Sequence, residues 1–290
     1  MASAIVQGTK IRFLQLGEWH TAPPLVLIHG LATSSGFWFR AVEQLAARHP
    51  VLIYDLRGHG RSAMPEIGYT PEVMAGDLVG LLDHLGISRC HAAAHSFGGS
   101  ILLHAALRAP DRFATLTLAD ARLRCFQPLL TPRAWHNWEE RLANLATIGI
   151  HLEPDQQEAG IVLLTALARH VVAHPDDTGN GPRWLLEFMG QRQNRTMAMR
   201  WLQLMETPGV FDALQEESAL VPESLRDLPH PLLALYGDDS PIRPSGEALK
   251  HLRPGTDLGL ILEAGHFFPA FKPAEFVQPL LAHLNAHADR

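Results

Sequence analysis

Short apolar runs alternate with amphipathic stretches through the first 120 residues of the chain. A run of about four to eight apolar residues that stops at a polar residue or a glycine is typical of a strand buried on both faces. Such runs, together with one polar–apolar alternation near the start, predict strands over residues 10–16, 24–28, 51–54, 90–94 and 115–119. The amphipathic stretches between them predict helices over residues 37–48, 70–86 and 97–108. Thr70 as N-cap, Pro71 at the first helical position and Gly86 as a stop mark the second helix.

The alternation breaks between residues 121 and 229, where the pattern indicates helices and loops. Helices are predicted there over residues 135–147, 156–172, 182–193 and 196–206. The alternation then resumes with a strand at 232–236, a helix at 245–252, a strand at 258–262 and a helix at 273–286. This order is typical of an α/β fold with a mostly parallel central sheet and helices on both faces. We therefore predict a core domain of residues 1–120 and 230–290, with a helical cap of residues 121–229 inserted between two strands.

Composition narrows the class of protein further. The chain has 290 residues, of which 47% are hydrophobic and 19% charged, with a net charge of −6. One large domain with an insertion fits this length, and an acidic balance argues against nucleic-acid binding. The two cysteines, Cys90 and Cys125, do not suggest a disulfide framework, which favours a cytoplasmic protein. We find no signal-peptide pattern at the start and no apolar run of about 18 residues, so we expect no membrane span.

One motif carries the candidate chemistry, the segment Ala94-His95-Ser96-Phe97-Gly98-Gly99. It lies between a predicted strand and a predicted helix, where a G-x-S-x-G turn exposes a nucleophilic serine above the sheet. Small residues two before and two after the serine keep the flanking backbones apart. Ala94 replaces the first glycine of the pattern and adds only a methyl group. The motif predicts Ser96 as a nucleophile.

The chain resembles the α/β-hydrolase family over essentially its whole length. Four landmarks in the family's order carry the resemblance: His29-Gly30-Leu31, the segment 55–62, the turn around Ser96, and Gly265-His266-Phe267-Phe268-Pro269. The resemblance implies that His266 is the general base and that the backbone N–H groups of Leu31 and Phe97 form an oxyanion hole. It implies no cofactor and no metal, and it makes the segment 55–62 a structural turn.

The third member of the triad departs from the family pattern. The family usually places its acid after the strand that follows the cap, and Ser240 occupies that slot in the segment 237–244. A serine cannot supply the negative charge that orients and stabilises the histidine. Asp239 could serve if the loop shifts by one residue, and Asp120, at the end of the preceding strand, could serve without a shift. We favour Asp120 and keep Asp239 as the alternative.

Two further features bear on ligands. His91 and His95 flank a strand, where a spacing of four residues separates them by about 13 Å, so they cannot share one metal ion. Arg122 and Arg124 follow Asp120 and could meet an anionic substrate, although ordinary surface charge explains them equally well.

The sequence thus predicts a cofactor-free serine hydrolase for an ester or thioester with a mostly apolar acyl or aromatic part. The substrate is a small molecule or a carrier-bound acyl group. Carbon–carbon hydrolysis or a lyase reaction on the same site remains an alternative, as does a ligand-binding accessory protein with weak turnover. The pattern leaves the oligomeric state open.

Overall fold

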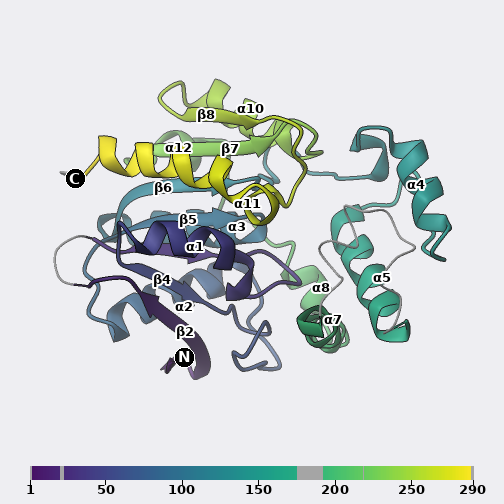
Figure 1. Ribbon diagram of the computed structural model, residues 1–290, viewed down its shortest axis with the longest axis horizontal. Helices are drawn as coiled ribbons and strands as arrows, with labels where there is room; N and C mark the ends of the chain where they lie inside the picture. The colour runs from purple at the N-terminus through teal and green to yellow at the C-terminus, as the bar shows by residue number, and fades with distance from the viewer. Residues whose placement is uncertain (1, 20–22, 175–191, 218, 289–290) are drawn as a thin grey trace.

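The computed structural model describes residues 2–19, 23–174, 192–217 and 219–288. One eight-stranded sheet, in the order β1-β2-β4-β3-β5-β6-β7-β8, forms its centre (Figure 1). The strands are β1 Ala2–Val6, β2 Thr9–Leu16, β3 Leu25–Ile28, β4 Val51–Tyr54, β5 Cys90–His95, β6 Phe113–Ala119, β7 Leu232–Gly237 and β8 Asp257–Ile261. Neighbours from β4 to β8 pair in parallel, and β1 and β2 are antiparallel. The predicted mostly parallel α/β sheet is confirmed.

Helices cover both faces of the sheet. In β3, Val26 and Ile28 pack in the cluster that holds α2 Pro71–His84 and α3 Phe97–Arg108, whereas Leu25 and Leu27 pack in the cluster that holds α1 Phe39–Ala46 and α12 Pro273–Ala286. Figure 1 shows α1, α12 and the short α11 Phe268–Phe271 on the near side of the sheet. Because side chains of a strand alternate between faces, a two-sided core requires the unbroken apolar runs seen in the sequence.

The first strand was missed by the sequence analysis. β1 pairs with β2 at the sheet edge through a tight turn at Gln7 and Gly8, whose φ angles are +48° and +72°. Two residues with positive φ at the tip are typical of a type I′ hairpin.

The segment between β6 and β7 contains α4 Trp138–Ala146, α5 Ala159–Ala173, α7 Arg192–Met205, α8 Val210–Ala213 and α9 Pro222–Arg226. Figure 1 shows α4, α5, α7 and α8 beside one end of the sheet. Part of this segment has a small core of its own, which includes Trp135 and Leu145, while Trp201 of α7 joins the main core. Most of the predicted helix 182–193 lies outside the described residues, and the next predicted helix begins earlier, at Arg192.

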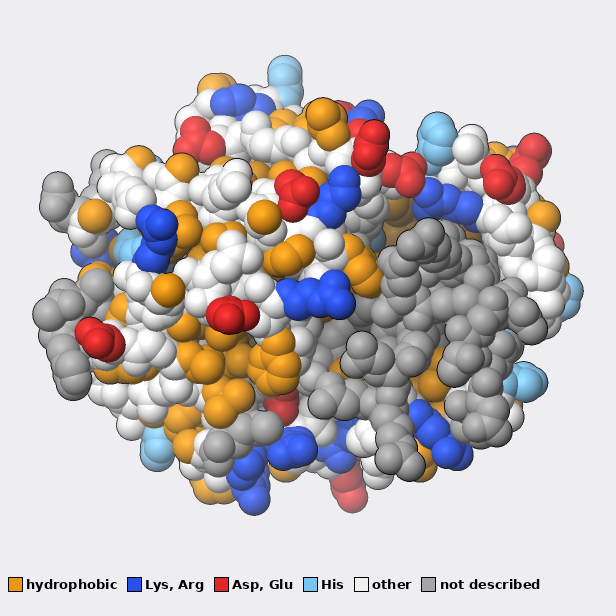
Figure 2. Space-filling model, viewed as in Figure 1, with side chains coloured by type: hydrophobic (Ala, Val, Ile, Leu, Met, Phe, Trp, Pro, Cys, Tyr) orange, Lys and Arg blue, Asp and Glu red, His pale blue; other side chains and the backbone are white. Residues whose placement is uncertain are grey.

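Two further observations concern the helices and the surface charge. Within the part of the chain that is described, no helix is both long and apolar enough to cross a membrane. On the face drawn in Figure 2, basic and acidic side chains are interspersed rather than gathered by sign.

Candidate active site

Ser96 sits in a sharp turn between β5 and α3, with φ +53° and ψ −123°. This backbone conformation costs on the order of 1–3 kcal/mol for a residue other than glycine, so the surrounding structure must hold it. Neighbouring backbones crowd the turn: a Cβ on Gly30 would lie 3.0 Å from the Cβ of Ser96, and a Cβ on Gly98 would lie 2.7 Å from the carbonyl oxygen of His29. Ala94 is fully buried in the core, which accommodates its methyl group.

His266 lies in the loop after β8 and reaches across to Ser96. Its Nε2 is 3.0 Å from the Ser96 Oγ, and its Nδ1 is 2.7 Å from an oxygen of Asp120.

A second histidine, His95, holds the loop that carries His266. Burial lowers the pKa of His95 well below its usual range, and the neighbouring His266 lowers it further. The neutral His95 ring donates from Nε2 to the carbonyl oxygen of His266 at 2.9 Å. The sequence analysis did not find this contact.

Asp120 follows β6, is completely buried and has a φ of +52°. One carboxylate oxygen accepts the backbone N–H of Gly237 at 2.9 Å. The other accepts the Ser240 hydroxyl at 2.5 Å as well as the His266 ring. Because β6 and β7 are parallel neighbours, the loops that follow them meet at one edge of the sheet. Ser240, in the family's usual acid slot, therefore lies beside Asp120 as a hydrogen-bond donor.

Asp239, the alternative acid, points elsewhere. Its carboxylate forms an ion pair with Arg141 of α4 at 2.5 Å, and its side chain is 36% exposed. A carboxylate occupied by a guanidinium is poorly placed to stabilise a charge on the His266 ring. The geometry therefore favours Asp120, with no shift of the loop.

The predicted oxyanion donors, Leu31 and Phe97, line the same cavity as Ser96 and His266. Phe97 is the first residue of α3, so its backbone N–H lies in the first turn, where helix N–H groups have no partner within the helix. The partial positive charge of a helix N-terminus also favours a developing oxyanion there.

The cavity above Ser96 has a volume of about 630 Å³. Core loops line it on one side, and the segment between β6 and β7 lines it on the other with Leu130, Trp135, Ile161, Leu164, Leu167 and Trp201. The size suits a small ligand, and most of the wall is apolar.

The three arginines that line the cavity are paired with carboxylates. Arg122 and Arg124 share the Glu158 carboxylate at 2.8 and 2.5 Å. Arg122 also donates to the carbonyl oxygens of residues 127 and 128, so backbone and Glu158 hold it in place. Both arginines thus line the cavity as ion-paired side chains. Glu217 accepts both the Ser100 hydroxyl and the backbone N–H of Arg124.

Comparison with known proteins places the chain in a family. Residues 23–273 match the family model of the alpha/beta hydrolase fold, and the chain belongs to this family. It is thus an α/β hydrolase.

Individual relatives cover most of the chain at low identity. A putative carbamate hydrolase RutD of Caulobacter segnis is 26% identical over 269 residues, which are 90% of this chain and 91% of that protein. The dihydrolipoyllysine-residue acetyltransferase component of the acetoin cleaving system of Pseudomonas putida is 29% identical over 293 residues, covering 98% of this chain and 69% of that protein. The solved enol-lactonase of Burkholderia xenovorans LB400 is 25% identical with a TM-score of 0.69, covering 98% of this chain and all of that one.

Proposed function

We propose that this protein is a serine hydrolase that cleaves an ester or thioester through an acyl-enzyme on Ser96. The observation that carries the proposal is the unbroken series of contacts from Ser96 through His266 to Asp120 at the wall of an apolar cavity. Each member of the series has the chemistry its place requires: a hydroxyl, an imidazole and a buried carboxylate.

The reaction follows from this order of groups. The Ser96 oxygen attacks the substrate carbonyl carbon while its proton passes to Nε2 of His266. The N–H groups of Leu31 and Phe97 hold the resulting oxyanion, at about 3–4 kcal/mol for each such donor. Collapse of the intermediate expels the alcohol or thiol, which takes the proton from His266. A water molecule then attacks the acyl-enzyme by the same route, with His266 as base, and releases the carboxylic acid and free Ser96.

Asp120 keeps His266 in the productive tautomer. Its carboxylate accepts from Nδ1 and stabilises the imidazolium that forms when Nε2 takes the serine proton. Gly237 and Ser240 donate to the carboxylate, so its negative charge is satisfied although it is completely buried.

The cavity favours a neutral substrate with an apolar acyl or aromatic part. Its arginines are already paired with acids, so a free carboxylate or phosphate would have to compete with Glu158 or Asp239. Residues 121–229 act as a cap in this proposal, since their apolar side chains line the wall opposite Ser96. The likeness to an enol-lactonase supports ester chemistry, because a lactone is a cyclic ester.

A series of p-nitrophenyl esters from acetate to dodecanoate, with matching acyl thioesters, tests the proposal. We expect turnover that peaks at one chain length and falls by about a million-fold in Ser96→Ala, as for loss of a serine nucleophile elsewhere. Ser88→Ala is the matched control, since Ser88 is exposed and lies on the loop before β5. Equal turnover in Ser96→Ala and the wild type would overturn the proposal.

A further inference from the structure

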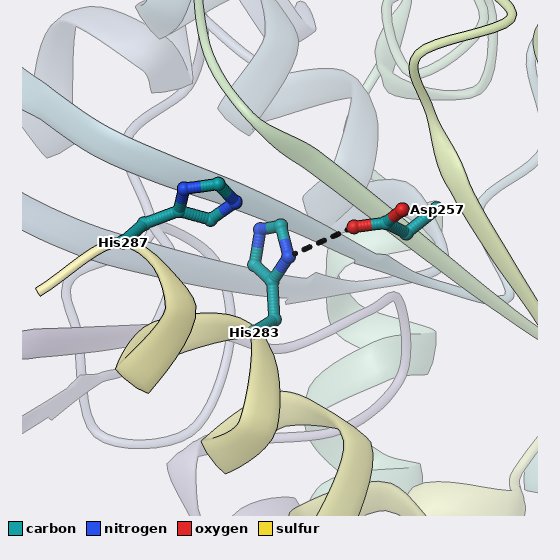
Figure 3. A group of neighbouring side chains, drawn as sticks. All are labelled: Asp257, His283 and His287. Carbon is teal, nitrogen blue, oxygen red and sulfur yellow. Dashed lines mark ion pairs between the residues drawn. The ribbon is translucent and has the colours of Figure 1, made fainter.

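A cluster of three potential metal ligands lies at the end of the sheet where β8 begins, whereas Ser96 lies at the opposite end, after the last residue of β5. Asp257 begins β8, whereas His266 follows the other end of that strand. His283 lies in the last turn of α12, and His287 is the residue that caps its C-terminal end (Figure 3). We infer that Asp257, His283 and His287 bind one divalent transition-metal ion of the zinc type.

The spacing of the three side chains carries the inference. Two histidines four residues apart lie on the same face of a helix, an arrangement that zinc sites use. Their ring centroids are 4.9 Å apart. One potential ligand atom from each of the three residues lies within 4.8 Å of those of the other two. Figure 3 shows the His283 ring between the His287 ring and the Asp257 carboxylate.

The contact between His283 and Asp257 has an informative length. Their Nδ1 and Oδ2 atoms are 3.4 Å apart. A charge-assisted hydrogen bond would be shorter, at about 2.7–2.9 Å. Two ligand atoms on one tetrahedral zinc ion, each bonded at about 2.0–2.1 Å, stand about 3.4 Å from each other. The observed separation is therefore compatible with two ligands of a common ion.

His283 is buried beside an accessible carboxylate. The residue is 5% exposed and its Nδ1 faces Asp257, while its ring also interacts with the backbone of Pro231. The Asp257 side chain is 67% exposed, so an ion could reach the cluster from solvent.

The donor set selects the metal. Two imidazoles and one carboxylate suit zinc, cobalt, nickel or copper, whereas magnesium and calcium prefer all-oxygen sites. A bound ion would join the start of β8 to the end of α12. β8 has five residues, so about 16 Å of strand separates the cluster from the loop that carries His266. The ion would consequently brace the fold and take no part in the reaction proposed for Ser96.

Cobalt and zinc titration of the full-length, chelator-treated protein tests the site. We expect one equivalent of Co²⁺ to give the visible absorption of a tetrahedral site, and Zn²⁺ to displace it. Zinc in about hundredfold excess over its Kd should raise the Tm by about 5 °C. His287→Ala and Asp257→Asn should each weaken binding at least about tenfold and, at the same zinc concentration, reduce the rise in Tm to about half or less.

His251→Ala, an exposed histidine of α10 Arg243–Leu252, is the matched control and should bind like the wild type. Ester turnover should not change when zinc is added, so this test and that of the proposed hydrolase fail separately. Three results would each overturn the site: no saturable binding, equal binding by His287→Ala and the wild type, or binding only at millimolar metal without a change in Tm.

Discussion

Replacement of Asp120 by asparagine tests the assignment of the acid most severely. The carboxylate of Asp120 accepts three donors, from Gly237, Ser240 and His266, and no water can replace them in a fully buried site. An asparagine has only one acceptor oxygen, so its NH₂ group must face one of these donors or force His266 into the wrong tautomer. We expect kcat to fall about 10⁴-fold, which is about 5.4 kcal/mol of transition-state stabilisation.

The matched control is Asp239→Asn. Asp239 contributes a partly exposed ion pair with Arg141, and such pairs contribute little. We expect its kcat to stay within about threefold of the wild-type value, and the effect of the substitution to fall on KM. Stopped-flow or steady-state hydrolysis of the best p-nitrophenyl ester measures both variants, and circular dichroism confirms that Asp120→Asn is folded.

Moving the acid to position 240 separates a catalytic role of Asp120 from a structural one. The Ser240 hydroxyl already touches the Asp120 oxygen that faces His266. An aspartate there could approach the same ring nitrogen from the neighbouring loop. The double variant Asp120→Asn/Ser240→Asp should recover at least about tenfold of the activity lost in the single variant. A larger loss in Asp239→Asn than in Asp120→Asn would refute the reasoning.

Three further predictions concern stability. Burial, above all, lowers the pKa of His59 to about 3 and of His91 to about 4, so the folded chain resists protons that the unfolded chain binds near its ordinary pKa of about 6.5. The free energy of unfolding should therefore fall as the pH is lowered from about 7 to 5, by up to about 1.4 kcal/mol per pH unit for each such ring. Urea titrations at several pH values measure this fall, which should be smaller in His91→Gln than in the wild type. Gly98→Ala should lower the free energy of unfolding by about 1–3 kcal/mol and reduce turnover, because its Cβ would meet the backbone of β3 and of the following residue. Gly255→Ala is the control: it has open space around its Cβ and should change neither stability nor turnover. Asp77→Asn should lower the free energy of unfolding by about 3–5 kcal/mol in the same titration, because it leaves the buried Arg57 without its bidentate partner. Asp155, whose ion pair is exposed, provides the control, and an equally small loss in Asp77→Asn and Asp155→Asn would contradict this prediction.

Strands of the central sheet could be predicted because both of their faces are apolar. β3 and β6 are buried at every position; β3 is a continuous apolar run in the sequence, and β6 is apolar except for two threonines. β1 lies at the edge and has three exposed residues among its five, so its pattern is too weak to see. The sequence pattern also places helix starts only approximately: α5 begins at Ala159, three residues after its predicted start.

The candidate site could be predicted where a short local motif carries it. Ser96 and His266 belong to such motifs, whereas the acid depends on which strands are neighbours. Ser240 was visible as a departure from the family pattern, but its role as a donor to Asp120 follows only from the pairing of β6 with β7. Partners far apart in sequence were likewise hidden: Arg122 meets Glu158 across 36 residues, and His95 meets the backbone of His266 across 171.

The central claim is that Ser96 is a nucleophile activated by His266 and Asp120. Intact-mass analysis after treatment with a fluorophosphonate tests it most directly, because this reagent forms covalent adducts preferentially with activated serines. We predict one adduct per chain, located on Ser96 by peptide mapping, with no adduct in Ser96→Ala and labelling at least about 10³-fold slower in His266→Ala. An unlabelled wild-type protein, or an adduct on another residue that persists in Ser96→Ala, would contradict the account.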